Sequence, residues 1–348
     1  MAASLPDEGA LRSAVAALLA GGLVAFPTET VYGLGADADR PDAVSAIFRV
    51  KGRPADHPLI LHVCDAKALG AWTRDVPACA YALVDRFWPG PLTLVLPRSA
   101  RASHAVTGGQ ETVGVRCPSH PWAQALLRDL AGARGDASVA LAAPSANRYG
   151  RISPTSAEHV RADFGPGPES GIACILDGGP STLGIESTIV DFPPGRVRIL
   201  RPGSILAAQL QDAAGVPAVD ALAGAQTPRT SGRVEGHYAP RKPLELVEPS
   251  SLSRRLEQLR GLRIGILAPA AHATGRPGSG AALLLRIDAP DAADEYARLL
   301  YRNLRELDAS AAQRLLVAMP PAGPAWDAIH DRLRRAAAGS AGAMDDAD

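Results

Sequence analysis

Two short polar clusters, each beside an apolar run, contain the residue types that phosphate chemistry requires. Residues 51–53 read Lys-Gly-Arg and precede a strand-like run, and residues 145–147 read Ser-Ala-Asn and follow one. Packing a hydrophobic core does not require Lys, Arg, Ser or Asn. Binding a polyanion such as a nucleoside triphosphate does, because cations and hydroxyl donors must replace its water shell. Taken singly, the first could be a solvated basic turn and the second a helix cap, so only their combination indicates function.

A third segment, PTETVYGLG at 27–35, follows another apolar strand-like run. It puts the hydroxyls of Thr28 and Thr30 at the edge of a sheet. We expect Gly33 and Gly35 to let this loop bend close to a ligand, because glycine lacks the side chain that would hold the backbone away. An ordinary strand-to-helix turn with a capping threonine is the alternative.

Further strand ends carry arginine and hydroxyl residues. Arg116 ends the alternating run 112–116, where its guanidinium could hold a carboxylate in a bidentate fork or form a surface ion pair. Residues 184–188 (GIEST) form a hydroxyl-lined loop or a plain turn. We interpret the proline-rich turn at 88–93 as structural. Residues 237–240 (HYAP) lie in the linker, where aromatic and imidazole groups have no core to fill, so we expect them to dock onto a binding partner or ligand.

The sequence contains no Walker loop, no Rossmann glycine fingerprint, no nucleophile elbow and no H-E-x-x-H helix. No residue is therefore an evident nucleophile. A site made of cations, hydroxyls and an amide positions substrates and stabilises charge on phosphate, and it needs no covalent intermediate.

The composition is that of a globular enzyme, with 47% hydrophobic and 21% charged residues among 348. Thirty-six basic and thirty-six acidic residues give zero net charge, so overall charge attracts the chain neither to nucleic acid nor to a membrane. Zero net charge is still compatible with a local basic groove. The four cysteines lack C-x-x-C spacing, the eight histidines lack metal-ligand spacing, and we expect no metal site and reduced thiols. With no signal peptide and no membrane-length apolar run, we expect a cytoplasmic protein.

Helices and strands are mixed along the first half without strict alternation, which predicts a twisted mixed α/β sheet. After about residue 243, strands and helices alternate, which predicts a small open parallel sheet. We therefore expect a catalytic domain over 8–206, a linker or lid over 207–243, a C-terminal α/β domain over 244–337 and a disordered tail over 338–348.

These clusters, in this order, resemble the YrdC-type family, and specifically the long two-domain form of threonylcarbamoyl-AMP synthase. The matching motifs span about two thirds of the chain and are PTETVYGLG, KGRPADHPL, PGPLTLVL, TVGVRCPSHP, APSANRYGRISPT, GIESTIVD, LRPG and HYAP. The resemblance implies a YrdC-like domain with a large, positively lined cavity, a smaller Rossmann-like C-terminal domain, and a linker that can cover the active site. His57 departs from the family pattern, which often has asparagine there, and this affects the local loop rather than the reaction.

The resemblance also implies a reaction in which L-threonine, bicarbonate or CO2, and ATP give threonylcarbamoyl-AMP and pyrophosphate. ATP is a substrate, Mg2+ is expected with it, and the product passes to a downstream transferase complex that modifies tRNA to threonylcarbamoyladenosine. By the same resemblance, Lys51 and Arg53 are the catalytic residues. The implied ATP-binding residues are Lys51, Arg53, Thr112, Ser145, Asn147, Ser153, Arg201 and Tyr238, and the implied threonine-binding residues are Thr30, His62, Arg116 and Ser187.

Two other functions are compatible with this family. One is a module that binds double-stranded RNA or tRNA without chemistry, which zero net charge disfavours because RNA binding favours a basic excess. The other is a carbamoyl-transfer module, which is usually fused to zinc-finger or acylphosphatase-like segments that this sequence lacks. Threonine-dependent release of pyrophosphate distinguishes the synthase from both.

Overall fold

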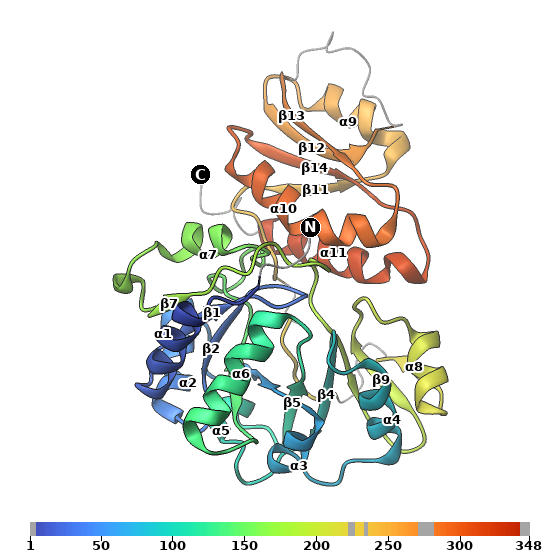
Figure 1. Cartoon of the computed structure of the whole chain (residues 1–348). Helices are drawn as coiled ribbons and strands as arrows, with labels where there is room; N and C mark the ends of the chain where they lie inside the picture. Colours follow the sequence, from blue (N-terminus) through green and yellow to red (C-terminus); the bar gives the residue numbers. More distant parts are fainter. Residues whose placement is uncertain (1–4, 222–226, 233–235, 271–281, 342–348) are drawn as a thin grey trace. The chain divides into compact units, whose positions relative to one another are not determined.

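The computed structural model describes residues 5–221, 227–232, 236–270 and 282–341 (Figure 1). The chain divides into two compact units. The first comprises Met1–Tyr149 and Ser153–Arg233, and the second comprises Gly150–Ile152 and Val234–Asp348.

The first unit is built on one mixed sheet of ten strands, as the irregular order of elements predicts. The strand order is β10-β9-β8-β4-β5-β3-β6-β2-β1-β7, and parallel and antiparallel pairs both occur. The strands are β1 (Val24–Phe26), β2 (Gly33–Asp37), β3 (Ile60–Val63), β4 (Leu92–Pro97), β5 (Thr112–Arg116), β6 (Ala140–Ala143), β7 (Cys174–Ile175), β8 (Thr188–Asp191), β9 (Val197–Arg201) and β10 (Ala218–Asp220).

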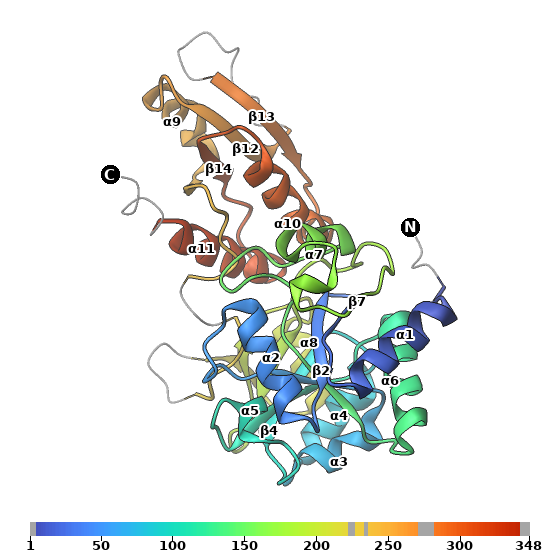
Figure 2. The same ribbon diagram turned by 90° about the vertical axis from the view of Figure 1, so that its left-hand side faces the viewer.

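Helices cover this sheet and enclose two hydrophobic clusters. The helices are α1 (Glu8–Leu19), α2 (Pro41–Lys51), α3 (Leu69–Trp72), α4 (Ala78–Phe87), α5 (His104–Thr107), α6 (Pro121–Arg134), α7 (Ala157–Phe164) and α8 (Ala207–Ala214). The larger cluster joins the strands to α2, α3, α4, α7 and α8. The smaller one joins β1 and β6 to α1 and α6, which pack against each other (Figure 2).

Strand alternation decides which face of the sheet carries polar residues. On β5, Val113 and Val115 enter the larger core, so Thr112, Gly114 and Arg116 point to the opposite face. The same alternation applies on β3 and β4, where His62 and Thr93 share the polar face. This second face, which we call the site face, also has a small apolar cluster of Val95, Ile189 and Leu200.

The second unit contains a four-stranded, entirely parallel sheet in the order β11-β14-β12-β13. The prediction of a small parallel sheet in this half is confirmed. Its elements are β11 (Leu244–Val247), α9 (Leu252–Gln258), β12 (Arg263–Pro269), β13 (Ala282–Ala289), α10 (Ala293–Ala309), β14 (Arg314–Ala318) and α11 (Asp327–Ala341).

Two predicted segments contain more regular structure than the sequence pattern indicated. Residues 207–243 were expected to be a linker, but α8 and β10 occupy its first part, and β10 pairs with β9 of the large sheet. Residues 338–348 were expected to be a disordered tail, but α11 continues to Ala341, and 342–348 lie outside the described residues.

The glycines of the PTETVYGLG segment make room for a core side chain, which corrects the expectation that Gly33 and Gly35 let the backbone bend close to a ligand. Gly33 and Gly35 lie in β2, paired with β1. A Cβ on Gly35 would stand 2.8 Å from the ring of Phe26, and one on Gly33 would stand 3.0 Å from it. These two glycines therefore make room for an aromatic side chain on the neighbouring strand.

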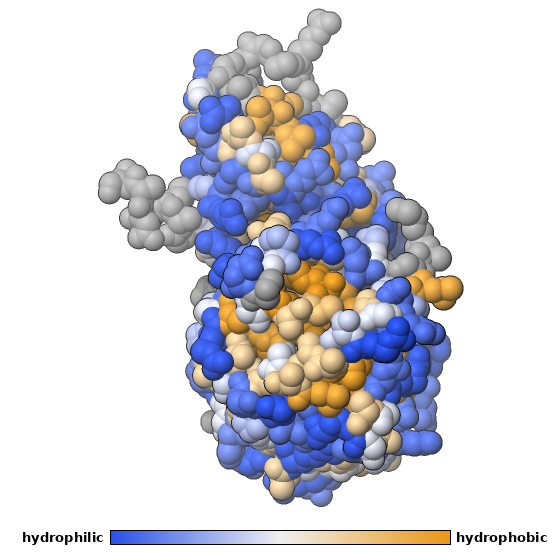
Figure 3. All heavy atoms as spheres, turned by 60° about the vertical axis from the view of Figure 1, so that its left-hand side comes forward, coloured by the Kyte–Doolittle hydropathy of each residue, from blue (hydrophilic) through white to orange (hydrophobic). Residues whose placement is uncertain are grey.

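Figure 3 shows one face of the molecule coloured by hydropathy. Hydrophilic residues cover much of it, and hydrophobic residues gather in an area within the first unit. Within the described ranges, no helix combines the length and apolar character that crossing a membrane requires. All four cysteines are free thiols.

Candidate active site

A glycine turn brings both predicted catalytic cations to the interior of the first unit. Helix α2 ends at Lys51, and Gly52 takes the left-handed conformation (φ 66°), which glycine adopts without strain. The Arg53 amide then donates back to the Phe48 carbonyl at 2.9 Å. Because the chain reverses within one residue, both side chains point inward, and Lys51 is 3% and Arg53 7% exposed.

The Lys51 ammonium lies on the loop that carries the second polar cluster. Its Nζ donates to the carbonyl of Ser145 at 2.6 Å and to the carbonyl of Asn147. Burial lowers the pKa of Lys51 well below its ordinary value, and the nearby Arg53 guanidinium lowers it further. The two clusters, ninety-odd residues apart in the sequence, are therefore in direct contact.

The same loop is held against the segment that contains Thr30. The Ala146 amide donates to the Tyr32 carbonyl at 2.8 Å, and Ser145 bridges to Gly33. The Tyr32 amide donates in turn to the Pro154 carbonyl at 2.9 Å, which places Ser153 beside the same segment. The Ser153 hydroxyl donates to Glu186 at 2.6 Å.

Arg116 is a buried guanidinium, 4% exposed, at the end of β5. Its Nη1 donates to the Thr30 hydroxyl at 2.8 Å, its Nε donates to the Gly90 carbonyl at 3.3 Å, and its Nη2 lies 2.7 Å from Glu29 Oε1. The turn at 88–93, interpreted from the sequence as purely structural, therefore supplies a carbonyl that orients this side chain.

His62 is the register partner of Arg116 on the adjacent strand β3. Burial, and secondarily the Arg116 charge, lowers the pKa of His62 to about 3. Its imidazole is therefore neutral at physiological pH and can exchange hydrogen bonds with a ligand without adding charge. Its ring meets Phe26 edge-on, with the centroids 5.8 Å apart.

Ser187 and Arg201 form a second group beside Arg116. The Arg201 Nε and Nη2 donate to the Ser187 carbonyl at 3.2 and 3.0 Å, and Nη2 also reaches the Ser187 hydroxyl at 3.2 Å. The hydroxyls of Ser187 and Thr93 are 2.8 Å apart, and Thr93 is the register partner of Arg116. This hydroxyl pair connects the two arginines.

Arg53 and Arg201 meet at one serine. Arg53 Nη2 lies 3.4 Å from the Ser231 hydroxyl, and Arg201 Nη1 donates to the Ser231 carbonyl at 3.0 Å. The end of α2 and the end of β9 thus direct their guanidinium groups to the same place.

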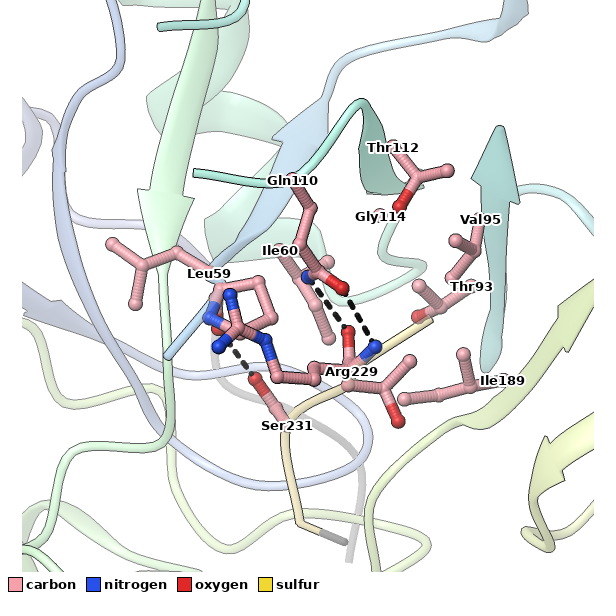
Figure 4. Close-up of a pocket in the computed structure, with 12 residues that line it drawn as sticks. Leu59, Ile60, Thr93, Val95, Gln110, Thr112, Gly114, Ile189, Arg229 and Ser231 are labelled. Carbon is pink, nitrogen blue, oxygen red and sulfur yellow. Dashed lines mark hydrogen bonds between the residues drawn. The ribbon is translucent and has the colours of Figure 1, made fainter. Parts of the chain in front are cut away.

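The segment that contains Ser231 crosses the site face (Figure 4). Gln110 and Arg229 exchange two hydrogen bonds, from the Arg229 amide to Gln110 Oε1 at 2.7 Å and from Gln110 Nε2 to the Arg229 carbonyl at 3.1 Å. The Ser231 hydroxyl donates to the Pro58 carbonyl at 3.0 Å. The pocket beneath is lined by Thr112, Thr93, Val95, Ile60, Gly114 and Ile189, among others.

Tyr238 belongs to the second unit. It has a positive φ of 64°, and its ring stacks on Tyr301 with centroids 5.5 Å apart. The Arg332 guanidinium lies 5.6 Å from the centre of its ring, and His237 meets it edge-on at 4.1 Å. The HYAP motif, expected to dock onto something, is packed within the second unit, where Tyr238 stacks on Tyr301 of α10.

Eleven of the twelve predicted site residues thus lie in the first unit. Hydrogen bonds join Lys51 to Ser145 and Asn147, Thr30 to Arg116, and Arg201 to Ser187, and strand register pairs His62 with Arg116. Thr112 lines the pocket, and Ser153 bonds to Glu186. Sequence reasoning missed Glu29, Glu186, Ser231, Gln110 and Arg229. Glu29 and Glu186 are only 5% and 7% exposed, and no local pattern marks a carboxylate as buried. Ser231 lies in the weakly patterned stretch, where nothing indicates contact with a sheet.

These features define an α/β protein whose polar sheet face gathers arginines, a buried lysine, hydroxyls and a neutral imidazole for an anionic ligand. The Sua5, YciO and YrdC family, described as "Telomere recombination", matches residues 16–203, and the family "Threonylcarbamoyl-AMP synthase, C-terminal domain" matches residues 205–338. The chain therefore belongs to the threonylcarbamoyl-AMP synthases. The predicted family, activity and enzyme class, a nucleotidyltransferase, are confirmed.

Similar proteins of nearly equal length support this assignment. The threonylcarbamoyl-AMP synthase of Pyrococcus abyssi is 37% identical over 95% of this chain and 94% of its own length, and that of Bacillus subtilis is 39% identical over 96% and 94%. Among solved structures, P. abyssi Sua5 complexed with L-threonine superposes with a TM-score of 0.80 at 35% identity, covering 97% of this chain and 96% of that one. A His-Tyr double variant of the same protein gives 0.79 at 34% identity, covering 96% and 94%.

Proposed function

We propose that the chain joins L-threonine, bicarbonate or CO2, and ATP into threonylcarbamoyl-AMP with release of pyrophosphate, for transfer to tRNA. One observation carries the proposal. Arg116 is suited to an amino-acid carboxylate, and the pair Arg53 and Arg201 is suited to phosphates. The hydroxyls of Thr93 and Ser187 connect these two positions on the site face. An amino acid and a nucleotide bound on one face would meet with their reacting groups adjacent.

In the proposed site, threonine binds beside Arg116, and the phosphates of ATP bind beside Arg53 and Arg201. Threonine would contact Thr30, His62, Arg116 and Ser187. ATP would contact Lys51, Arg53, Thr112, Ser145, Asn147, Ser153 and Arg201. The ATP-binding role of Tyr238, which lies in the second unit, stays a prediction. Threonine carbamate would attack the α-phosphate in line, and the cations would stabilise the charge that develops on pyrophosphate.

Mg2+ would enter with the nucleotide. Among the described residues, no three acidic, histidine or cysteine side chains lie together as a metal site would require. Mg2+ commonly keeps several waters and binds through substrate phosphates rather than a protein cage, so the donor set fits an ion carried by ATP. When bound, the ion would neutralise phosphate charge, while the chain's own cations orient the phosphates.

We propose that the segment 227–232 is a lid and that a large cavity opens on the site face when it leaves. Its contacts include the exchange with Gln110, the bonds of Ser231, a bond from Arg229 to the Gly108 carbonyl at 2.8 Å and an exposed ion pair of Arg229 with Asp56. These contacts are polar, so water can replace them when the segment opens locally. Opening would free the guanidinium donors that Ser231 now occupies.

The lid predicts a specific effect for Gln110→Ala. Losing two hydrogen bonds should destabilise the closed segment by about 1–3 kcal/mol. KM for ATP should fall several-fold, because the closed segment occupies guanidinium donors of Arg53 and Arg201 that ATP needs. Hydrogen exchange of 227–232 should accelerate without a change in melting temperature. Gln258→Ala, an exposed glutamine in the second unit, is the matched control. Unchanged exchange and kinetics in Gln110→Ala would make the segment a tether.

Pyrophosphate release tests the proposed function directly. Incubation with ATP and bicarbonate should release pyrophosphate only when L-threonine is added, because the carbamate forms on the amino group. (R)-3-hydroxybutanoate, which is threonine without that amino group, should not support release. Release that is independent of threonine, or RNA binding without any turnover, would overturn the proposal.

A further inference from the structure

Glu29 and Arg116 form a buried pair of opposite charges whose two facing polar atoms contact each other without a well-oriented hydrogen bond. Glu29 Oε1 and Arg116 Nη2 are 2.7 Å apart, and both side chains are at least nine-tenths buried. Neither atom has a hydrogen-bond partner of adequate geometry within the described part of the chain. Their contact is therefore an ion pair that is poorly oriented as a hydrogen bond.

The remaining polar atoms of the two side chains are occupied. Glu29 Oε2 accepts from the Ser119 amide at 3.1 Å, which fixes the carboxylate. Arg116 Nη1 and Nε donate to Thr30 and to the Gly90 carbonyl. Buried charged groups normally satisfy nearly all their hydrogen-bonding capacity. Apart from their ion pair with each other, Glu29 Oε1 and Arg116 Nη2 leave such capacity unmet, and a ligand with both a donor and an acceptor would meet it.

A zwitterionic amino acid has this combination. Its α-carboxylate would accept from Arg116 Nη2, and its α-ammonium would donate to Glu29 Oε1. A simple anion such as phosphate or bicarbonate would satisfy the arginine but would be repelled by the adjacent carboxylate. The net charge of the pair is zero, and it matches a ligand whose net charge is also zero.

The neighbouring histidines do not alter this balance. Burial lowers the pKa of His62 to about 3 and also lowers the pKa of His120. His120 Nδ1 accepts from the Trp122 amide, so its buried Nε2 carries the proton of the neutral ring. Both imidazoles are therefore neutral at physiological pH.

We infer that Glu29 is a threonine-binding residue whose carboxylate accepts the α-ammonium group while Arg116 takes the α-carboxylate. The inference rests on the proposed function and adds a residue to it. The position of Glu29 also bears on how the threonine nitrogen moves toward ATP after carbamate formation. Carbamate formation changes the charge at this nitrogen: the α-ammonium first releases a proton to solvent, and the free amine then forms a C–N bond to CO2 and releases a second proton, which leaves an anionic carbamate. Glu29 would therefore attract the substrate ammonium and then repel the carbamate toward the cations Lys51, Arg53 and Arg201.

Binding to Glu29→Gln tests the inference, with L-threonine and (R)-3-hydroxybutanoate compared by calorimetry on the full chain. We expect the affinity for threonine to fall about tenfold, because a neutral amide cannot replace the charged acceptor. The affinity for the analogue, which has no ammonium group, should stay equal or increase. Binding of a non-hydrolysable ATP analogue should not change. Glu111→Gln, at an exposed glutamate, is the control.

The outcomes separate three possibilities. An equal loss for both ligands in Glu29→Gln would overturn the inference, because it would show that Glu29 only positions Arg116. Undiminished threonine binding would overturn it as well. If wild-type chain binds no threonine, the proposed function fails instead. Should Glu29→Gln lose its cooperative melting transition, Glu29→Asp keeps the charge at shorter reach. It should then weaken threonine binding and spare the analogue, and any other pattern would count against the inference.

Discussion

Replacing Lys51 with methionine should lower kcat/KM for ATP by about 100- to 1,000-fold, the effect typical of removing one charge-stabilising donor from a preorganised site. Methionine retains most of the side-chain length, so the packing at the end of α2 is largely kept. The lost ammonium both donates to the Ser145 and Asn147 carbonyls and provides the charge next to Arg53. Steady-state release of pyrophosphate at varied ATP measures the effect.

The chain has a matched control, since one of its three lysines, Lys67, is exposed at the surface. Lys67→Met makes the same chemical change and should leave kinetics and stability unaltered. Near-normal turnover in Lys51→Met, with a normal melting temperature, would show that Lys51 only braces the loop at 145–147.

The free energy of unfolding should depend on pH differently in wild type and in Lys51→Met. Burial lowers the pKa of Lys51 well below 10.5, so the unfolded chain binds more protons than the folded chain between the lowered pKa and 10.5. The free energy of unfolding should therefore receive from Lys51 a contribution that rises with pH across that window, and Lys51→Met should lack it. Urea unfolding measured at a series of pH values up to 10.5 compares the pH dependence of stability in wild type and Lys51→Met.

The sequence predicted the strands that carry the site because period-two alternation is a local property. Val113 and Val115 alternate with Thr112 and Arg116, and the structure places the two pairs on opposite faces of β5. Sheet order is not local. Nothing in residues 60–63 indicates that β3 lies between β5 and β6, and that order makes His62 the neighbour of Arg116.

The errors have the same origin, since each depended on a partner remote in sequence. Gly35 suggested a bend toward a ligand, but its partner is Phe26 on the neighbouring strand. The turn containing Gly90 suggested only stiffness, but its carbonyl holds Arg116. Glu29 lies inside the PTETVYGLG motif, but the sequence does not mark it as a site residue. A carboxylate is usually exposed, and the burial of Glu29 depends on its pairing with Arg116.

Replacing Arg116 with lysine should raise KM for threonine by about 100-fold while KM for ATP stays within about twofold. Lysine keeps a positive charge beside Glu29, so no unpaired buried carboxylate remains to destabilise the fold. A single ammonium cannot reproduce the planar fork that contacts Thr30, Gly90 and Glu29 from separate nitrogens. Arg116→Lys should also lose affinity for (R)-3-hydroxybutanoate, unlike Glu29→Gln, because the carboxylate site itself is changed.

Arg128→Lys, on the exposed side of α6, is the control for this exchange and should behave as wild type. Initial rates at varied threonine and fixed ATP, then at varied ATP and fixed threonine, separate the two KM values. Equal increases in both would mean that Arg116 supports the whole site face rather than one ligand, because Thr93, its register partner, joins it to Ser187 and Arg201. A selective increase for threonine would assign Arg116 to the amino acid, and an unchanged KM for threonine would place its carboxylate elsewhere on the site face.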